Sequence, residues 1–208
     1  MAVIDHLVYF VPRLDTAIDW FDDELGVRPS IGGSHPGMGT HNALVSLGDC
    51  YLELLAPDPE QPEPSAARPF GIDELSEPRL VTFAVRPSQV ESLGDVAEAM
   101  RRVGHDPGPA TTMSRRTPAG VELQWTLTLP TLAADGFVPF LIDWGTTPNP
   151  ATSAPGGVRL FDLMGTTPHH EFANAVLDAI GLEEMATHGT GGLSAILDGA
   201  IGTVPLVL

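Results

Sequence analysis

Residues 34–42 read SHPGMGTHN, and this glycine-rich stretch carries two histidines, His35 and His41. An imidazole with the ordinary pKa of about 6.5 can act as a general base at neutral pH or bind a metal. A phosphate-binding loop is excluded, because the next segment, NALVSLG, alternates like a strand and offers no helix N-terminus. A serine nucleophile is excluded as well, because proline follows where the nucleophile elbow needs glycine. Two interpretations remain: a hairpin loop with solvated histidines, or a loop that brings His35 to a substrate.

Other residues have side chains that could bind a substrate. Arg115 and Arg116 are adjacent, and in so acidic a chain this pair could anchor a carboxylate or an enolate oxygen, or else lie at a solvated hairpin tip. Asn42 begins a strand and could point its amide inward. Further along the chain, Gln124 could provide a second amide, and Trp125 and Trp144 could provide aromatic walls. The two tryptophans could instead pack against the helices.

The charge of the chain excludes several classes of function. The formal net charge is −17 over 208 residues, and all ten basic residues are arginines. So acidic a chain repels nucleic acid and anionic lipid, which argues against binding to either. The absence of lysine excludes Schiff-base catalysis, Ser-Lys dyads and P-loop nucleotide hydrolysis.

The remaining composition is that of an ordinary globular protein. The first residues, MAVIDHLVYF, lack the basic region and the cleavage site of a signal peptide, and no apolar run is long enough to span a bilayer. The single cysteine, Cys50, cannot form an internal disulfide. We therefore expect a cytoplasmic protein.

The elements that position these residues recur three times, each time as a strand, a helix and further strands. The units begin at VIDHLVYFV, LVTFAVR and VRLFDLM, and their helices end at Gly26, Gly104 and Gly181, at nearly equal intervals. This spacing favours a structural repeat over chance. The expected boundaries are a first βαβββ module over 1–57, a proline-rich connector over 58–78, a second βαβββ module over 79–146, and a shorter βαβ-type module over 147–208 packed on the same domain.

Polar residues also mark where each helix should begin. Asp15 is a plausible N-cap of the first helix, and Ser88 with Glu91 has the spacing of a capping box before the second. In the third, Thr167 is the expected cap, ahead of a proline at the first helical position.

The order of these motifs resembles that of a known family. The segment DHLVYFVPRLDTAIDWFDDELGVRP, the loop GGSHPGMGTHNALV and the strand YLELLAPD occur in sequence, followed by SRRTPAGVELQW and VPFLIDW. Over roughly residues 3 to 146 they resemble the glyoxalase-like domain family of the vicinal oxygen chelate superfamily. The resemblance implies an α+β fold in which repeated βαβββ modules form a curled, cup-shaped mixed sheet with helices on the outside.

The resemblance also implies metal ligands inside the cup. Carried over by position, these are His6 on the first strand, Glu53 on the fourth and Asp143 in the second module, whereas the position equivalent to His6 in that module falls near Val81 or Thr82. Three ligands and a water suffice for one divalent metal, and Zn, Fe, Mn or Ni are equally compatible. His35 would then act as the general base or supply the missing ligand, and Glu53 could also move a proton.

Three functions follow as hypotheses. The first is a glyoxalase-like enzyme, of lyase, isomerase or dioxygenase type, that stabilises an enolate or oxyanion with or without a metal. The second is a cup that binds or sequesters an apolar or aromatic metabolite or antibiotic without chemistry, and the third is a structural or regulatory module. The partner in the first two is a small molecule, and many relatives pair, so we expect a homodimer.

Overall fold

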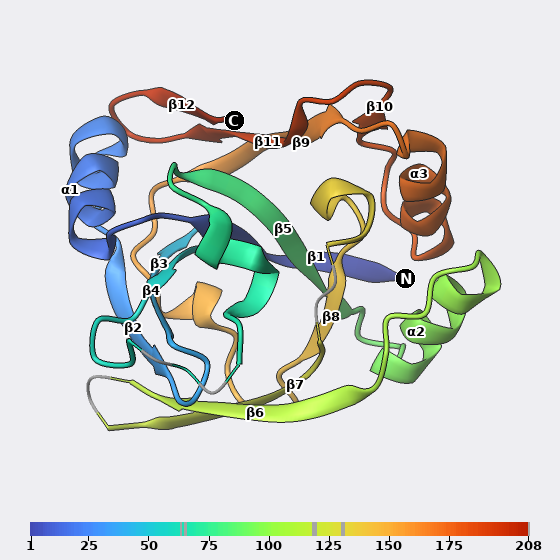
Figure 1. Cartoon of the computed structure of the whole chain (residues 1–208), viewed down its shortest axis with the longest axis horizontal. Coiled ribbons are helices and arrows are strands. Elements are labelled where there is room, and N and C mark those ends of the chain that lie inside the picture. Colours follow the sequence, from blue (N-terminus) through green and yellow to red (C-terminus); the bar gives the residue numbers. More distant parts are fainter. Residues whose placement is uncertain (63, 65, 118–119, 130–131, 208) are drawn as a thin grey trace.

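The computed structural model describes residues 1–62, 64, 66–117, 120–129 and 132–207, although not the side chain of Arg116 (Figure 1). The first strand–helix–strand unit comprises β1 (Ala2–Phe10), α1 (Leu14–Leu25), β2 (Ser30–His35), β3 (Thr40–Ser46) and β4 (Tyr51–Pro57). The second comprises β5 (Arg79–Pro87), α2 (Leu93–Arg102), β6 (Ala110–Arg116), β7 (Glu122–Thr128) and β8 (Phe140–Asp143). The third comprises β9 (Arg159–Thr166), α3 (His170–Ala179), β10 (Ala186–Thr187), β11 (Gly192–Asp198) and β12 (Thr203–Leu206). Short 3₁₀ segments lie at Pro69–Glu74, Ala133–Gly136 and Pro150–Thr152.

The first two units form one curled sheet of eight strands in the order β2-β3-β4-β1-β5-β8-β7-β6. In each unit the first strand pairs in parallel with the last, β1 with β4 and β5 with β8, and the antiparallel β1–β5 pair joins the units. The predicted fold class is confirmed: an α+β protein in which βαβββ modules curl into a cup with the helices outside (Figure 1).

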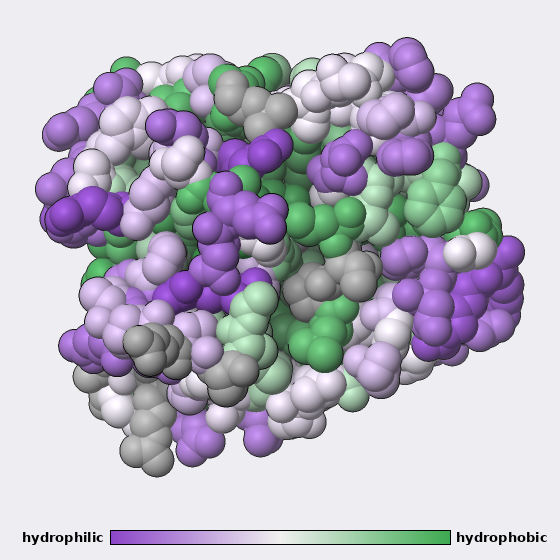
Figure 2. Space-filling model, viewed as in Figure 1, coloured by the Kyte–Doolittle hydropathy of each residue, from purple (hydrophilic) through white to green (hydrophobic). Residues whose placement is uncertain are grey.

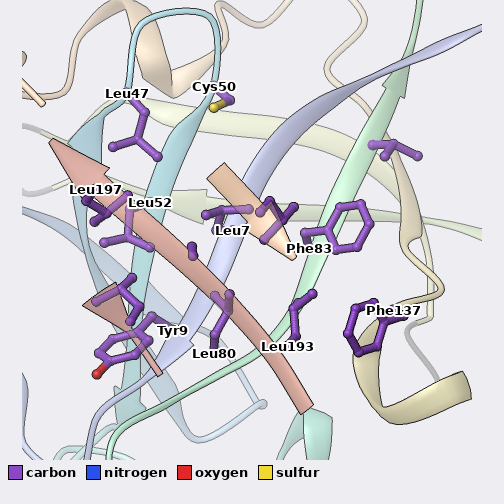
Figure 3. Packing of buried hydrophobic residues seen from close by; sticks show 14 of the residues in the cluster. Leu7, Tyr9, Leu47, Cys50, Leu52, Leu80, Phe83, Phe137, Leu193 and Leu197 are labelled. Atoms are coloured by element: carbon purple, nitrogen blue, oxygen red, sulfur yellow. The ribbon is translucent and has the colours of Figure 1, made fainter. Parts of the chain in front are cut away.

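The third unit forms a separate sheet of four strands in the order β10-β9-β11-β12. Leu193 and Leu197 of β11 pack against Leu7 of β1 and Phe83 of β5, on the face of the large sheet that points away from the cup (Figure 3). The third unit therefore does not lengthen the eight-stranded sheet. It buries the outer face of the two central strands.

A second hydrophobic cluster lines the opposite face of the large sheet, inside the cup. It contains Val8 of β1, Leu55 of β4, Trp125 of β7 and Phe140 of β8. On the face of the molecule drawn in Figure 2, hydrophobic residues show in the central hollow and also along the upper edge and the right side, with hydrophilic residues between them.

The helix boundaries agree with prediction at their C-termini better than at their N-termini. Gly26 ends α1 in the left-handed conformation with a φ of 71°, as predicted. The N-cap of α1 is Arg13, however, so the prediction of Asp15 was wrong by two residues. The N-cap of α3 is His169, so the prediction of Thr167 as the cap, followed by a proline at the first helical position, was wrong by two residues. The Thr167 hydroxyl instead accepts a hydrogen bond from the His169 backbone.

No helix in the described part of the chain combines the length and apolar character needed to cross a membrane.

Candidate functional site

A cavity of about 80 Å³ lies inside the cup. Seven of the ten residues predicted to bind a substrate or a metal line it: His6, His35, Asn42, Glu53, Arg115, Trp125 and Trp144. The other lining residues are Met38, Thr40, Tyr51, Leu55, Pro69, Phe70, Met113, Leu127, Leu129, Phe140 and Ile142. One side of the cavity is therefore polar and the rest is apolar and rich in aromatic rings, which is typical of small-molecule sites.

The strand pattern explains why His6 and Glu53 meet. In the parallel β1–β4 pair His6 is opposite Tyr51 and Val8 is opposite Glu53, so the two functional side chains are diagonal neighbours on one face. Strand β3 runs antiparallel to β4 and places Asn42 opposite Leu55 on the same face. Because alternate residues point to one side, three strands aim their polar side chains into the cup.

Glu53 is the centre of the polar side. The residue is 9% exposed, and its Oε1 accepts a hydrogen bond of 2.6 Å from the Asn42 amide. The Nε2 atoms of two histidines flank it: His6 Nε2 lies 3.8 Å from Oε2, and His35 Nε2 lies 3.7 Å from Oε1. Burial of a carboxylate is costly without such partners, and this arrangement offsets that cost.

The hydrogen bonds of His35 determine where its proton sits. The Asn42 Nδ2 group, which can only donate, lies 3.2 Å from His35 Nε2, so Nε2 is the acceptor. His35 Nδ1 then carries the proton and donates it to the Thr40 hydroxyl at 2.9 Å. Burial lowers the pKa of His35, an effect that the nearby Glu53 carboxylate partly opposes and Arg115 reinforces. His35 is thus a neutral imidazole at pH 7, with a lone pair beside Glu53.

His6 is held on the opposite side of Glu53 by the residue that precedes it. Its Nδ1 lies 2.8 Å from Asp5 Oδ1, and its ring stacks on Tyr51 with centroids 4.7 Å apart. Asp5 is fully buried and also accepts hydrogen bonds from the Trp144 indole and the Asn149 amide. Burial raises the pKa of Asp5, but the His6 and Trp144 contacts outweigh burial, and its net pKa is lowered.

Arg115 brings a buried positive charge to the cup. Its side chain is 4% exposed, and Nη1 donates a hydrogen bond to the Gly32 carbonyl, which joins the two edge strands β6 and β2. Burial lowers the pKa of Arg115, and Glu53 and Tyr51 partly oppose the shift. A guanidinium nonetheless stays charged in proteins. Gly32 must be glycine here, because a Cβ would lie 2.1 Å from Asn42 Oδ1.

Two of the predicted residues, Asp143 and Gln124, are not brought into the cavity. Asp143 is exposed, and its Oδ1 accepts a hydrogen bond from the Gly145 backbone. Gln124 is also exposed, on the face of β7 opposite to Trp125. The side chain of Arg116 lies outside the described residues.

The polar residues of the cavity do not supply the ligand set implied for a divalent metal. Of the three ligands carried over by position, only His6 and Glu53 face the cavity, and Glu53 uses one oxygen for Asn42. His35, the residue expected to supply a missing ligand, also faces the cavity, but its Nε2 accepts from Asn42. Within the described part of the chain, no three His, Cys, Asp or Glu side chains are grouped so that they could hold a metal ion. As arranged in this structure, the residues do not fit a metal centre, and the metal and its ligands stay predictions.

The connector between the first two units contributes to the site, which the sequence did not indicate. Gln61 donates from Nε2 to the carbonyl of His35 and accepts from the backbone of Gly37, at 3.2 and 2.8 Å. Arg68 donates to the Gly39 carbonyl at 2.7 Å. These bonds tie the loop that carries His35 to the connector, so the loop is not a free hairpin.

The lining residues that were missed from sequence include three aromatic side chains, Tyr51, Phe70 and Phe140. Phe70 of the connector lines the cavity beside Phe140, with ring centroids 5.8 Å apart, and it adopts a left-handed φ of 61°, which is costly for a bulky residue. Tyr51 could have been found by strand alternation, because it lies two residues before Glu53. The sequence around Phe70 carries no such signal.

Comparisons with known proteins agree with this architecture. A family model described as a glyoxalase-like domain matches residues 4–181. A hypothetical protein from Staphylococcus aureus has a similar structure, with a TM-score of 0.65 at 14% identity over 100% of this chain and 86% of that chain. Methylmalonyl-CoA epimerase from Mycobacterium tuberculosis gives a TM-score of 0.45 at 21% identity, over 72% of this chain and 91% of that chain. No curated protein matches the chain significantly.

The match to the family model covers most of the chain, including both units of the cup and every cavity residue. The chain therefore belongs to the glyoxalase-like domain family.

Proposed function

We propose that this protein is an enzyme that transfers a proton on a small carbonyl compound bound in the cup. One observation supports the proposal above others: two imidazole nitrogens lie within 3.8 Å of the buried Glu53 carboxylate, in a cavity that also holds Arg115. Three proton acceptors and a fixed cation in a largely apolar space are the groups that enolate chemistry requires.

Each group has a role that follows from its geometry. His35 is neutral, and its Nε2 accepts a hydrogen bond from the Asn42 amide. A substrate that displaces this bond frees the Nε2 lone pair to remove the proton from the carbon next to the carbonyl. The electron pair of that C–H bond forms the C=C bond of the enolate, the π pair of the carbonyl moves onto its oxygen, and Arg115 stabilises the negative charge there. Return of a proton to the other face of the same carbon, through Glu53 or His6 on the far side of Glu53, gives a stereoisomer of the substrate, so the reaction needs neither water nor a redox partner.

The apolar part of the cavity sets the class of substrate. Trp125 and Trp144, with ring centroids 5.3 Å apart, and Phe140 form an aromatic wall across from the polar residues. We infer a small substrate with one oxygen-bearing end and one apolar or aryl end.

Proton exchange with solvent tests the proposal without knowledge of the natural substrate. The protein is incubated in D₂O with 2-oxobutanoate, hydroxyacetone, phenylpyruvate or 2-hydroxyacetophenone, and loss of the C–H signal is followed by NMR against the uncatalysed rate. We expect exchange of at least one compound, and a fall of about 10²- to 10⁴-fold in His35→Gln and Glu53→Gln. Gln124→Ala, on the outer face of β7, is the matched control and should retain the wild-type rate.

The same experiment measures metal dependence. Because the donor set does not fit a metal centre, we expect exchange to survive a chelator and to be unchanged by added Zn²⁺, Mn²⁺ or Ni²⁺. Exchange that requires an added ion would show that His6 and Glu53 rearrange to bind it, and would revise the proposed roles.

A cup that binds without catalysis is the second candidate, and the aromatic lining favours it. Trp125 and Trp144 report binding directly through fluorescence. Saturable quenching by an aryl compound that shows no exchange above background would replace the enzyme proposal with this one.

A further inference from the structure

The geometry points to Asp5 as a positioning residue: its carboxylate holds His6 with the proton on Nδ1, so that the Nε2 lone pair faces Glu53. Asp5 does not touch the cavity, and nothing in the sequence marked it as functional. The expected effect of Asp5 on catalysis rests on the proposed function. The Asp5–His6 hydrogen bond does not depend on it.

A β-bulge makes the contact possible. Successive residues of a strand normally point to opposite faces, so Asp5 and His6 should be separated by the sheet. The register of β1 against β5 shifts between Ile4 and His6, which leaves Asp5 as the extra residue. Bulges of this kind redirect a side chain and are frequent beside active sites. Here the bulge allows Asp5 Oδ1 to reach His6 Nδ1 at 2.8 Å.

Donors from three other segments hold the Asp5 carboxylate in place. The Trp144 indole donates to both oxygens at 3.2 Å, Asn149 donates to Oδ2 at 2.6 Å, and Arg86 lies 3.3 Å from Oδ2. Asn149 belongs to the segment after β8 that leads to the third unit. With 0% exposure and four partners, Asp5 is a fully compensated buried anion whose position cannot change without breaking several bonds.

The ring of His6 is fixed on its other sides as well. It stacks on Tyr51 at an interplanar angle of 18° and meets the edge of Phe140 at 73°, with centroids 5.5 Å apart. Only the Nε2 edge is left to face the cavity, 3.8 Å from Glu53 Oε2. A carboxylate that accepts the Nδ1 proton fixes the tautomer and the orientation of the ring, so the Nε2 lone pair is directed at Glu53 and the cavity.

Long-range ¹H–¹⁵N NMR of the ligand-free protein tests the inference directly. The His6 ring is identified by the signal that disappears in His6→Gln, and in the wild type we expect the proton on Nδ1. In Asp5→Asn the new amide can donate to Nδ1, so we expect the proton to move to Nε2. Asn149→Ala, which keeps the Asp5–His6 bond, is the matched control and should keep the wild-type tautomer.

The D₂O exchange rate adds the functional readout. We expect Asp5→Asn, once its thermal melt shows that it is folded, to lower the exchange rate by about 10²- to 10⁴-fold while leaving the apparent affinity for the compound nearly unchanged. A wild-type His6 with its proton on Nε2 would overturn the inference without any variant, even if Asp5→Asn does not fold. An unchanged tautomer in folded Asp5→Asn would overturn it as well. The tautomer is measured without substrate, so absence of exchange in the wild type would count against the proposed function and not against the Asp5–His6 contact.

Discussion

His35 links the chemistry of the cup to the stability of the fold. Burial lowers the pKa of this histidine below its ordinary 6.5, whereas the unfolded chain keeps the ordinary value. As the pH falls, the unfolded state therefore takes up the proton first. The contribution of a neutral His35 to stability is complete above the unfolded pKa and is lost as the pH falls from there towards the folded pKa.

This linkage gives a prediction for His35→Gln. Between about pH 7.5 and about pH 5.5 the wild-type free energy of unfolding should decrease more than that of the variant, because glutamine does not titrate. Urea unfolding at the two pH values measures the difference. An equal decrease in both proteins would contradict the burial of a neutral imidazole at this position.

Strand alternation decides which side chains the sequence could place in the cup. His6, Asn42 and Glu53 were predicted because each lies on a strand whose pattern was clear. Asp143 was chosen because FLIDW resembles YLELL, but in β8 the inward residues are Phe140 and Ile142, and a one-residue difference in register reverses the face. Asp5 could not be predicted, since a bulge depends on the partner strand and not on local sequence.

At the scale of elements, the N-terminus of α2 shows how local signals compete. Two serines are each followed three residues later by an acidic residue, and the sequence favoured Ser88 with Glu91. The capping box in the structure is Ser92 with Asp95, with reciprocal bonds between each side chain and the backbone of the other. The prediction was wrong by four residues, because the buried face of α2 starts later, at Val96.

Substitution of the two serines should separate the true cap from the false one. Ser92→Ala removes the acceptor for the Asp95 backbone and should cost about 1 kcal/mol of stability. Ser88→Ala removes only a side-chain bond of 3.2 Å to Glu91, and its cost should be clearly smaller. Chemical unfolding of both variants measures the two costs. If Ser88→Ala cost as much as Ser92→Ala, the helix would begin earlier than described.

The connector is the element that sequence reasoning described least well. Its prolines and weak periodicity predicted a link between modules, yet it bonds to the loop of His35 and supplies Phe70 to the cavity. These contacts join residues more than twenty positions apart in the chain. Local propensity carries no information about such contacts, which is why the loop's surroundings could not be predicted.

On the scale of the whole molecule, one hydrophobic core connects all three units. The sequence predicted three units but not where the third would pack, because packing of one sheet on another is decided by contacts distant in the chain. Leu197 of β11 belongs to the same cluster as Leu52 of β4 and Phe83 of β5, and all three side chains are fully buried (Figure 3). A core shared in this way predicts that the units unfold together.

Leu197→Ala tests whether the third unit is part of that cooperative structure. The deletion of a fully buried leucine should cost about 2–5 kcal/mol, whereas Ile196→Ala, at the adjacent and partly exposed position, should cost less. All three tryptophans lie before residue 147, so their fluorescence reports only on the first two units, and far-UV circular dichroism reports on the whole chain. We expect Leu197→Ala to lower the urea midpoint of both signals equally. A midpoint that decreases by circular dichroism but not by fluorescence would mean that the third unit unfolds independently of the cup.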